Sequence, residues 1–134
     1  MCRDIVMAIR ARHIRNMKLG IKKYELRKTR LGQCREYRVW LCESGTAGRI
    51  VAAFTSRAFP ELTDLDDGRI ADLACITRAE VAGYRKGGHQ RLFGWLVEDF
   101  RYFGDTEQER HTAGFGLKRP PQSWCYARGG IEDG

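Results

Sequence analysis

Three charged residues near the N-terminus, Lys22, Glu25 and Arg27, have side-chain types and a spacing suited to binding a polar ligand. Gly20 permits a backbone turn that could bring Lys22 to the same charged face as the other two. An acid between two cations on a rigid strand could hold a phosphate-bearing molecule. A solvated ladder of salt bridges on a sheet edge is the alternative, because most surface charges have no specific partner.

Alternation of polar and apolar residues predicts that this segment is a half-buried strand. Tyr24 and Leu26 point to one face and should enter the core, whereas Lys23 joins Glu25 and Arg27 on the other face. The charged row would then lie on a rigid backbone and face either a cleft or solvent.

The motif extends beyond these residues. Gly20, Lys22, Glu25 and Arg27 form a G-x-K-x-x-E-x-R pattern, preceded by an apolar run at 5–9 and followed near the C-terminus by P-P-Q-S-W-C-Y at 120–126. This ordered set resembles the ASCH domain, a member of the PUA-like superfamily, over about residues 4 to 128. The resemblance implies a small β-barrel with flanking helices and a cleft that binds RNA.

Composition sets broad limits on the protein. A chain of 134 residues, 43% of them hydrophobic, fits one domain with a single core, expected over residues 1–128 with a flexible tail at 129–134. No apolar run approaches the roughly 20 residues needed to cross a bilayer. We therefore expect a soluble cytoplasmic protein.

Cysteine and histidine positions argue against a metal centre. The five cysteines are an odd number without C-x-x-C spacing, which fits neither a disulfide framework nor a zinc site. His13, His89 and His111 are scattered along the chain, and none lies at metal-ligand spacing from a cysteine. We expect free thiols, no metal and no cofactor.

Positive charge is concentrated at the N-terminal end. Residues 1–38 hold 12 Lys and Arg against 3 Asp and Glu, whereas the rest of the chain holds 12 against 14. Arginine supplies 18 of the 24 cations, and its planar guanidinium can pair with phosphate through two hydrogen bonds. A localised basic patch favours a polyanionic partner. A GC-rich genome would also enrich arginine, but it would not explain the clustering.

Hydrophobic periodicity predicts a mixed α+β chain built on a small PUA-like barrel of about six strands with two or three short helices. Residues 57–76 should be a surface excursion with one short helical turn, and 104–116 a polar, flexible stretch. The predicted helices cover 10–19 and 77–84, the second opening with a capping box at Thr77 and Glu80. The predicted strands cover 4–9, 23–28, 36–43, 49–56, 91–103 (bent near Gly94) and 122–127.

The predicted nucleic-acid-binding set combines cations, polar groups and an aromatic ring. Glu25 could accept a hydrogen bond from an exocyclic amine such as that of cytosine. Trp124, or Tyr126, could stack on a base, which is worth roughly 1–3 kcal/mol, although an aromatic residue on a final strand is also a common core residue. The full set is Arg10, Arg12, Arg15, Lys22, Lys23, Glu25, Arg27, Gln122, Ser123 and Trp124.

Hydrolysis is the alternative function. Some ASCH proteins act on N4-acylated cytidines or cleave RNA, and the resemblance implies that a lysine, a threonine three residues later and a distant glutamate do the work. Lys22 matches the lysine, but Glu25 occupies the threonine position, and a carboxylate cannot replace a hydroxyl nucleophile without changing the mechanism. A Lys22–Glu25 pair could still activate water as acid and base. Candidates for the distant acid are Glu80, Glu98 and Asp99, and His13 is an alternative base for RNA cleavage.

A third hypothesis is a protein–protein adaptor. The acidic stretch 61–72 would meet a protein partner, and the basic N-terminal arm would then have no role in binding.

Overall fold

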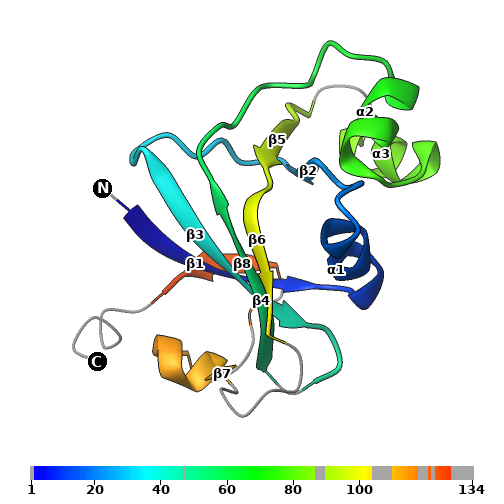
Figure 1. The fold of residues 1–134 in the computed structure, drawn as a ribbon. Helices are drawn as coiled ribbons and strands as arrows, with labels where there is room; N and C mark the ends of the chain where they lie inside the picture. The colour runs from blue at the N-terminus through cyan, green and yellow to red at the C-terminus, as the bar shows by residue number, and fades with distance from the viewer. Residues whose placement is uncertain are drawn as a thin grey trace.

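A six-stranded sheet forms the body of the computed structural model, which describes residues 2–46, 48–86, 90–103, 110–117, 121 and 123–127 (Figure 1). β1 and β3 run parallel, and the other paired strands are antiparallel. β7 (Arg110–His111) pairs with β4. The main path runs β6 (Glu98–Tyr102), β4 (Arg49–Ser56), β3 (Glu36–Glu43), β1 (Cys2–Ile9) and β8 (Trp124–Tyr126).

A second, two-stranded sheet carries the charged motif. It pairs β2 (Tyr24–Arg27) with β5 (Phe93–Leu96) in antiparallel register. Figure 1 shows the three α-helices on the same side of the main sheet, with α2 and α3 beside the β2–β5 pair. The helices are α1 (Ala11–Lys18), α2 (Asp67–Ala74) and α3 (Arg78–Arg85), and a 3-10 turn covers Thr112–Phe115.

The turn after α1 brings the motif lysine into position. Ile14 and Met17 are buried on one face of the helix, which fixes its rotation against the core. Gly20 then adopts a φ of +78°, and the backbone N–H groups of Ile21 and Lys22 both donate to the Asn16 carbonyl at 3.1 Å. The chain therefore reverses within a few residues and enters β2 with Lys22 directed inward.

Helix α2 was predicted only as a single helical turn, and that prediction is wrong. The Asp66 side chain accepts a hydrogen bond from the Arg69 backbone N–H, which caps an eight-residue helix. Ile70 and Ala74 of this helix are buried in a second apolar cluster with Leu26. The acidic composition of this segment gives no helical signal in the sequence, because the stability of this helix comes from tertiary packing.

The single strand predicted over 91–103 is two strands. The chain leaves β5 at Val97, whose N–H donates to the Lys23 carbonyl, and enters β6, which pairs with β4. Asp99 adopts a φ of +50° at this transition. The residues that share one continuous polar–apolar alternation therefore belong to two strands in two different sheets.

The mixed α+β class and the short helices are confirmed, and the described residues contain eight strands where about six are predicted. A closed barrel is not confirmed. Among the described residues β6 and β8 are the two ends of the sheet path, and they do not pair with each other. Residues 110–116, expected to be flexible, contain β7 and the 3-10 turn, and the tail at 129–134 lies outside the described residues. None of the described helices has the length and apolarity needed to span a bilayer.

Candidate functional site

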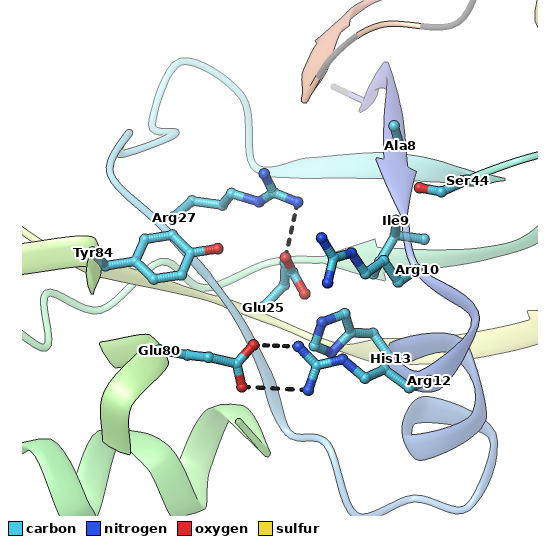
Figure 2. A pocket seen from close by; sticks show the side chains of 10 residues that line it. All are labelled: Ala8, Ile9, Arg10, Arg12, His13, Glu25, Arg27, Ser44, Glu80 and Tyr84. Carbon is cyan, nitrogen blue, oxygen red and sulfur yellow. Dashed lines mark hydrogen bonds and ion pairs between the residues drawn. The ribbon is translucent and has the colours of Figure 1, made fainter. Parts of the chain in front are cut away.

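A pocket of about 440 Å³ lies between the end of β1, the start of α1, strand β2 and helix α3 (Figure 2). Its walls are predominantly polar, with three guanidinium groups and two carboxylates. The lining residues are Ala8, Ile9, Arg10, Arg12, His13, Glu25, Arg27, Ser44, Glu80 and Tyr84.

Glu25 is the buried acid of this pocket, with only 5% of its surface exposed. Its Oε2 lies 2.9 Å from Nη2 of Arg27, and its Oε1 lies 3.4 Å from Nζ of Lys22. Lys22, 3% exposed, also donates a hydrogen bond to the carbonyl oxygen of Ala74 at the end of α2. Lys22 therefore supports Glu25 from behind and does not line the pocket.

The charges around Glu25 determine its protonation state. Burial alone would raise the pKa of Glu25, but the positive charges of Arg27 and Lys22 hold that pKa below its ordinary value. The group is therefore an ionised carboxylate at neutral pH. Its Oε1 is buried and makes no hydrogen bond among the described residues beyond its 3.4 Å ion pair with Lys22.

Arg12 and Glu80 close one side of the pocket. The two nitrogens Nη1 and Nη2 of Arg12 donate to the two carboxylate oxygens of Glu80, as Figure 2 shows. Glu80 also accepts from the Thr77 backbone N–H at 2.9 Å as part of the capping box of α3. The hydrogen bonds from Arg12 and Thr77 lower the pKa of Glu80 to about 2.

Arg10 is the cation in this pocket with the greatest freedom to bind an anion. Its side chain is exposed at the start of α1, and among the described residues it has no ion-pair partner. Arg12 and Arg27, by contrast, are both paired with acids. An anionic ligand would meet Arg10 without first breaking an ion pair.

His13 contributes a neutral imidazole to the same wall. Burial lowers its pKa, Lys22 and Arg12 lower it further, and Glu25 partly opposes them. Its Nδ1 is buried without a hydrogen-bond partner in the described structure.

Arg27 links the pocket to the C-terminal strand. Its Nη1 donates to Oγ of Ser123 at 2.7 Å, immediately before β8. Trp124 packs edge-on against Trp95, with ring centroids 5.3 Å apart, and against Tyr126 at 5.4 Å. Trp124 is therefore a half-buried neighbour of the main core and is not part of the pocket wall.

The overall fold matches crystal structures of the ASCH protein ZmASCH from Zymomonas mobilis. The chain has the ASCH fold. A serine-to-alanine mutant of ZmASCH gives a TM-score of 0.73 at 13% identity, covering 98% of this chain and 92% of that one. A tyrosine-to-phenylalanine mutant gives 0.69 at 14% identity, with 98% and 94% covered, and ZmASCH itself gives 0.69 at 14%, with 98% and 92% covered. No protein-family model and no curated protein matches the sequence.

Within this ASCH fold, the residues predicted to bind nucleic acid occupy three kinds of position. Arg10, Arg12, Glu25 and Arg27 line the pocket, while Lys22 and Ser123 contact two of them from outside its wall. Arg15, Lys23 and Trp124 do not line it, and Gln122 lies outside the described residues.

The acids proposed for hydrolysis are separated by the fold. Glu80 faces the pocket, whereas Glu98 and Asp99 pair with Arg57 at 3.6 and 3.1 Å at the start of β6. Tyr84 was not predicted as a site residue, although it lies one helical turn after Glu80 and so on the same face of the predicted helix.

Two acids of the acidic stretch 61–72 form ion pairs with arginines at 85 and 91. Glu61 pairs with Arg91 and Asp67 with Arg85, both at 2.7 Å. In the part of the chain that the structure describes, none of these acids pairs with the basic N-terminal arm. That part also holds no group of three His, Cys, Asp or Glu side chains positioned to bind a metal ion.

Proposed function

We propose that the pocket binds one nucleotide unit of RNA or another single-stranded nucleic acid. The observation that carries this proposal is the buried, ionised Glu25 in the wall of a polar pocket of about 440 Å³. Its Oε1 makes no hydrogen bond in the described structure beyond its ion pair with Lys22. A carboxylate in that position accepts from the amino or imino groups of a base edge.

The other groups of the pocket suit the remaining parts of a nucleotide. Arg10 is exposed and unpaired in the described structure, so it can contact a phosphate with a charge-assisted hydrogen bond. Tyr84 contributes an aromatic ring, and its hydroxyl points toward Arg27 and Glu25 (Figure 2). In this arrangement Tyr84, and not Trp124, provides the aromatic surface for a base.

Fluorescence anisotropy with labelled oligoribonucleotides over a salt series tests this function. Each phosphate contact contributes a slope of about −0.7 to the plot of log affinity against log salt for single strands. Arg10→Ala should therefore weaken binding and reduce the magnitude of that slope by about 0.7. Arg69→Ala, which removes an exposed arginine on α2, is the charge-matched control and should leave both unchanged. Absence of binding at low salt, or equal effects of the two variants, would contradict the proposal.

A hydrolase is the second candidate, supported by the placement of Glu80 in the same pocket as Glu25, which pairs with the buried Lys22. The protonation state of Glu25 makes hydrolysis less favoured than binding. Lys22 and Arg27 lower the pKa of Glu25, and a carboxylate with a low pKa is a weak general base at neutral pH.

Mass spectrometry after incubation with N4-acetylcytidine and short RNAs separates the two candidates. Binding without conversion supports the first. Conversion that is retained in Arg69→Ala but lost in Glu25→Gln, under conditions where urea unfolding shows that the Glu25→Gln variant is folded, would reverse the ranking.

A further inference from the structure

A second groove, of about 240 Å³, lies on the other side of α1 from the pocket. It runs between α1, the end of β3 and strand β6, which Figure 1 shows next to the helix. Its lining residues are Ala11, Ile14, Arg15, Lys18, Glu43 and Tyr102.

Tyr102 presents an aromatic ring in this groove. It is 46% exposed on β6, the end strand of the main sheet, so packing does not account for its position. Nζ of Lys18 lies 4.3 Å from the ring centroid, in a cation–π contact. A base can stack on this ring once the flexible Lys18 side chain moves off the face it covers, and the same ammonium can then meet the adjacent phosphate.

The charges of the groove also favour a polyanion. Arg15 and Lys18 are both exposed, and among the described residues neither has a carboxylate partner. Glu43 is the acid that lines the groove, and a carboxylate next to a stacking ring can accept from a base amino group. The groove thus combines two cations that lack carboxylate partners in the described structure, one acid and one aromatic ring, and these kinds of group also line the pocket.

Helix α1 connects the two sites directly. Arg12 and His13 face the pocket, and Arg15 and Lys18 face the groove, within a helix of eight residues. A polynucleotide that crosses α1 would therefore contact both sites. This placement also explains why Arg15, a predicted binding residue, does not line the pocket.

We propose that the groove is a second subsite for single-stranded RNA, in which a base stacks on Tyr102 and phosphate contacts Arg15 and Lys18. The inference rests on the proposed function of the pocket, since the same strand would occupy both sites. An acidic peptide is the competing occupant, but it would gain nothing from Glu43 or from a flat stacking surface.

Comparing a dinucleotide with an oligoribonucleotide of about ten nucleotides tests the subsite, because only the longer ligand can span both sites. Tyr102→Ala should weaken binding of the longer RNA about tenfold, consistent with the loss of one base stack, and should leave the dinucleotide unaffected. Tyr102→Phe keeps the ring and should retain wild-type affinity. Arg15→Ala and Lys18→Ala should each reduce the salt slope by about 0.7 for the longer RNA only.

The possible failures are distinguishable. If the wild-type protein binds neither RNA, the pocket proposal fails and the subsite falls with it. If the wild type binds both RNAs and Arg10→Ala weakens both, but Tyr102→Ala changes neither, only the subsite is overturned. Equal weakening of both RNAs by Tyr102→Ala would also overturn it, as would tighter binding of a poly-glutamate peptide than of the longer RNA.

Discussion

Arg12 on α1 and Glu80 on α3 form a two-point ion pair across one side of the pocket. This pair holds together two helices that are far apart in the sequence. Glu80 simultaneously caps its own helix through Thr77, so one carboxylate fixes both the start of α3 and its position relative to α1.

We predict that Glu80→Gln lowers the free energy of unfolding by about 1 kcal/mol at neutral pH, the upper range for a solvent-screened pair with good geometry. Glutamine can preserve the capping box, so the substitution tests the charge pair in particular. The pKa of Glu80 is about 2 in the folded protein, against about 4.3 for an unfolded chain. The stabilisation is therefore fully present above about pH 4.3 and is lost as pH falls toward about 2.

Urea unfolding of both proteins over this pH range measures the effect. The difference between wild type and Glu80→Gln should shrink as pH falls. Asp64→Asn changes an exposed acid that forms no ion pair among the described residues, so it is the control and should leave stability at neutral pH nearly unchanged. A difference that stays constant with pH would mean that the ion pair contributes nothing.

Glu25→Gln should destabilise the protein far more, by about 3 kcal/mol or more, because it leaves the buried Lys22 without its carboxylate partner. Arg27 would lose its partner at the same time. Chemical denaturation with urea provides the measurement.

Glu36→Gln is the matched control, since it removes an acid that pairs with Arg57 on an exposed surface at 3.1 Å. It should cost much less than Glu25→Gln, because solvent screens an exposed pair. Similar losses for Glu25→Gln and Glu36→Gln would show that burial does not amplify the cost at Glu25.

Local sequence features predict the proximity of Lys22, Glu25 and Arg27 because a turn and a strand are short-range structures. Gly20 supplies the turn, and the period of two places Glu25 and Arg27 on one face. The same pattern does not reveal that this face is buried. Lys22 is enclosed because the Ala74 carbonyl from α2 reaches it, a contact set by tertiary packing.

The remaining walls of the pocket depend on long-range packing in the same way. Periodicity correctly predicts α3 and its capping box, but nothing local indicates that Glu80 meets Arg12. Likewise, alternation around Trp124 predicts a strand without telling which face meets the core, and its contact with Trp95 decides that. The switch of sheets at Val97 is also invisible to a local pattern.

His13 should titrate with a pKa below its ordinary value of about 6.5, because burial and the charges of Lys22 and Arg12 disfavour its protonated form. An NMR titration of its ring protons measures this directly. The unfolded chain binds that proton more tightly, so the contribution of His13 should reduce stability as pH falls below about 6.5. Glu80 partly opposes the shift, so Glu80→Gln should lower the pKa of His13 further. A midpoint at or above about 6.5 would contradict the buried environment.

Gly94→Ala should destabilise the fold by about 1–3 kcal/mol through overpacking. A Cβ at this position would lie 2.8 Å from Cδ1 of Tyr24 and 2.9 Å from Cδ1 of Leu62, where β5 pairs with the motif strand β2. Because Tyr24 belongs to β2, its displacement would also disturb the backbone that carries Glu25. Under the proposed function, reduced RNA affinity should therefore accompany the loss of stability.

Gly83→Ala provides the contrasting case for the same chemical change. Its added Cβ meets nothing within 4 Å, and alanine is favoured over glycine in a helix interior by roughly 0.5–1 kcal/mol. Thermal or urea unfolding should thus show destabilisation for Gly94→Ala and slight stabilisation for Gly83→Ala. If Gly94→Ala were neutral, Tyr24 could move without cost, and the close packing of β5 against the motif strand would not be what fixes the position of Glu25.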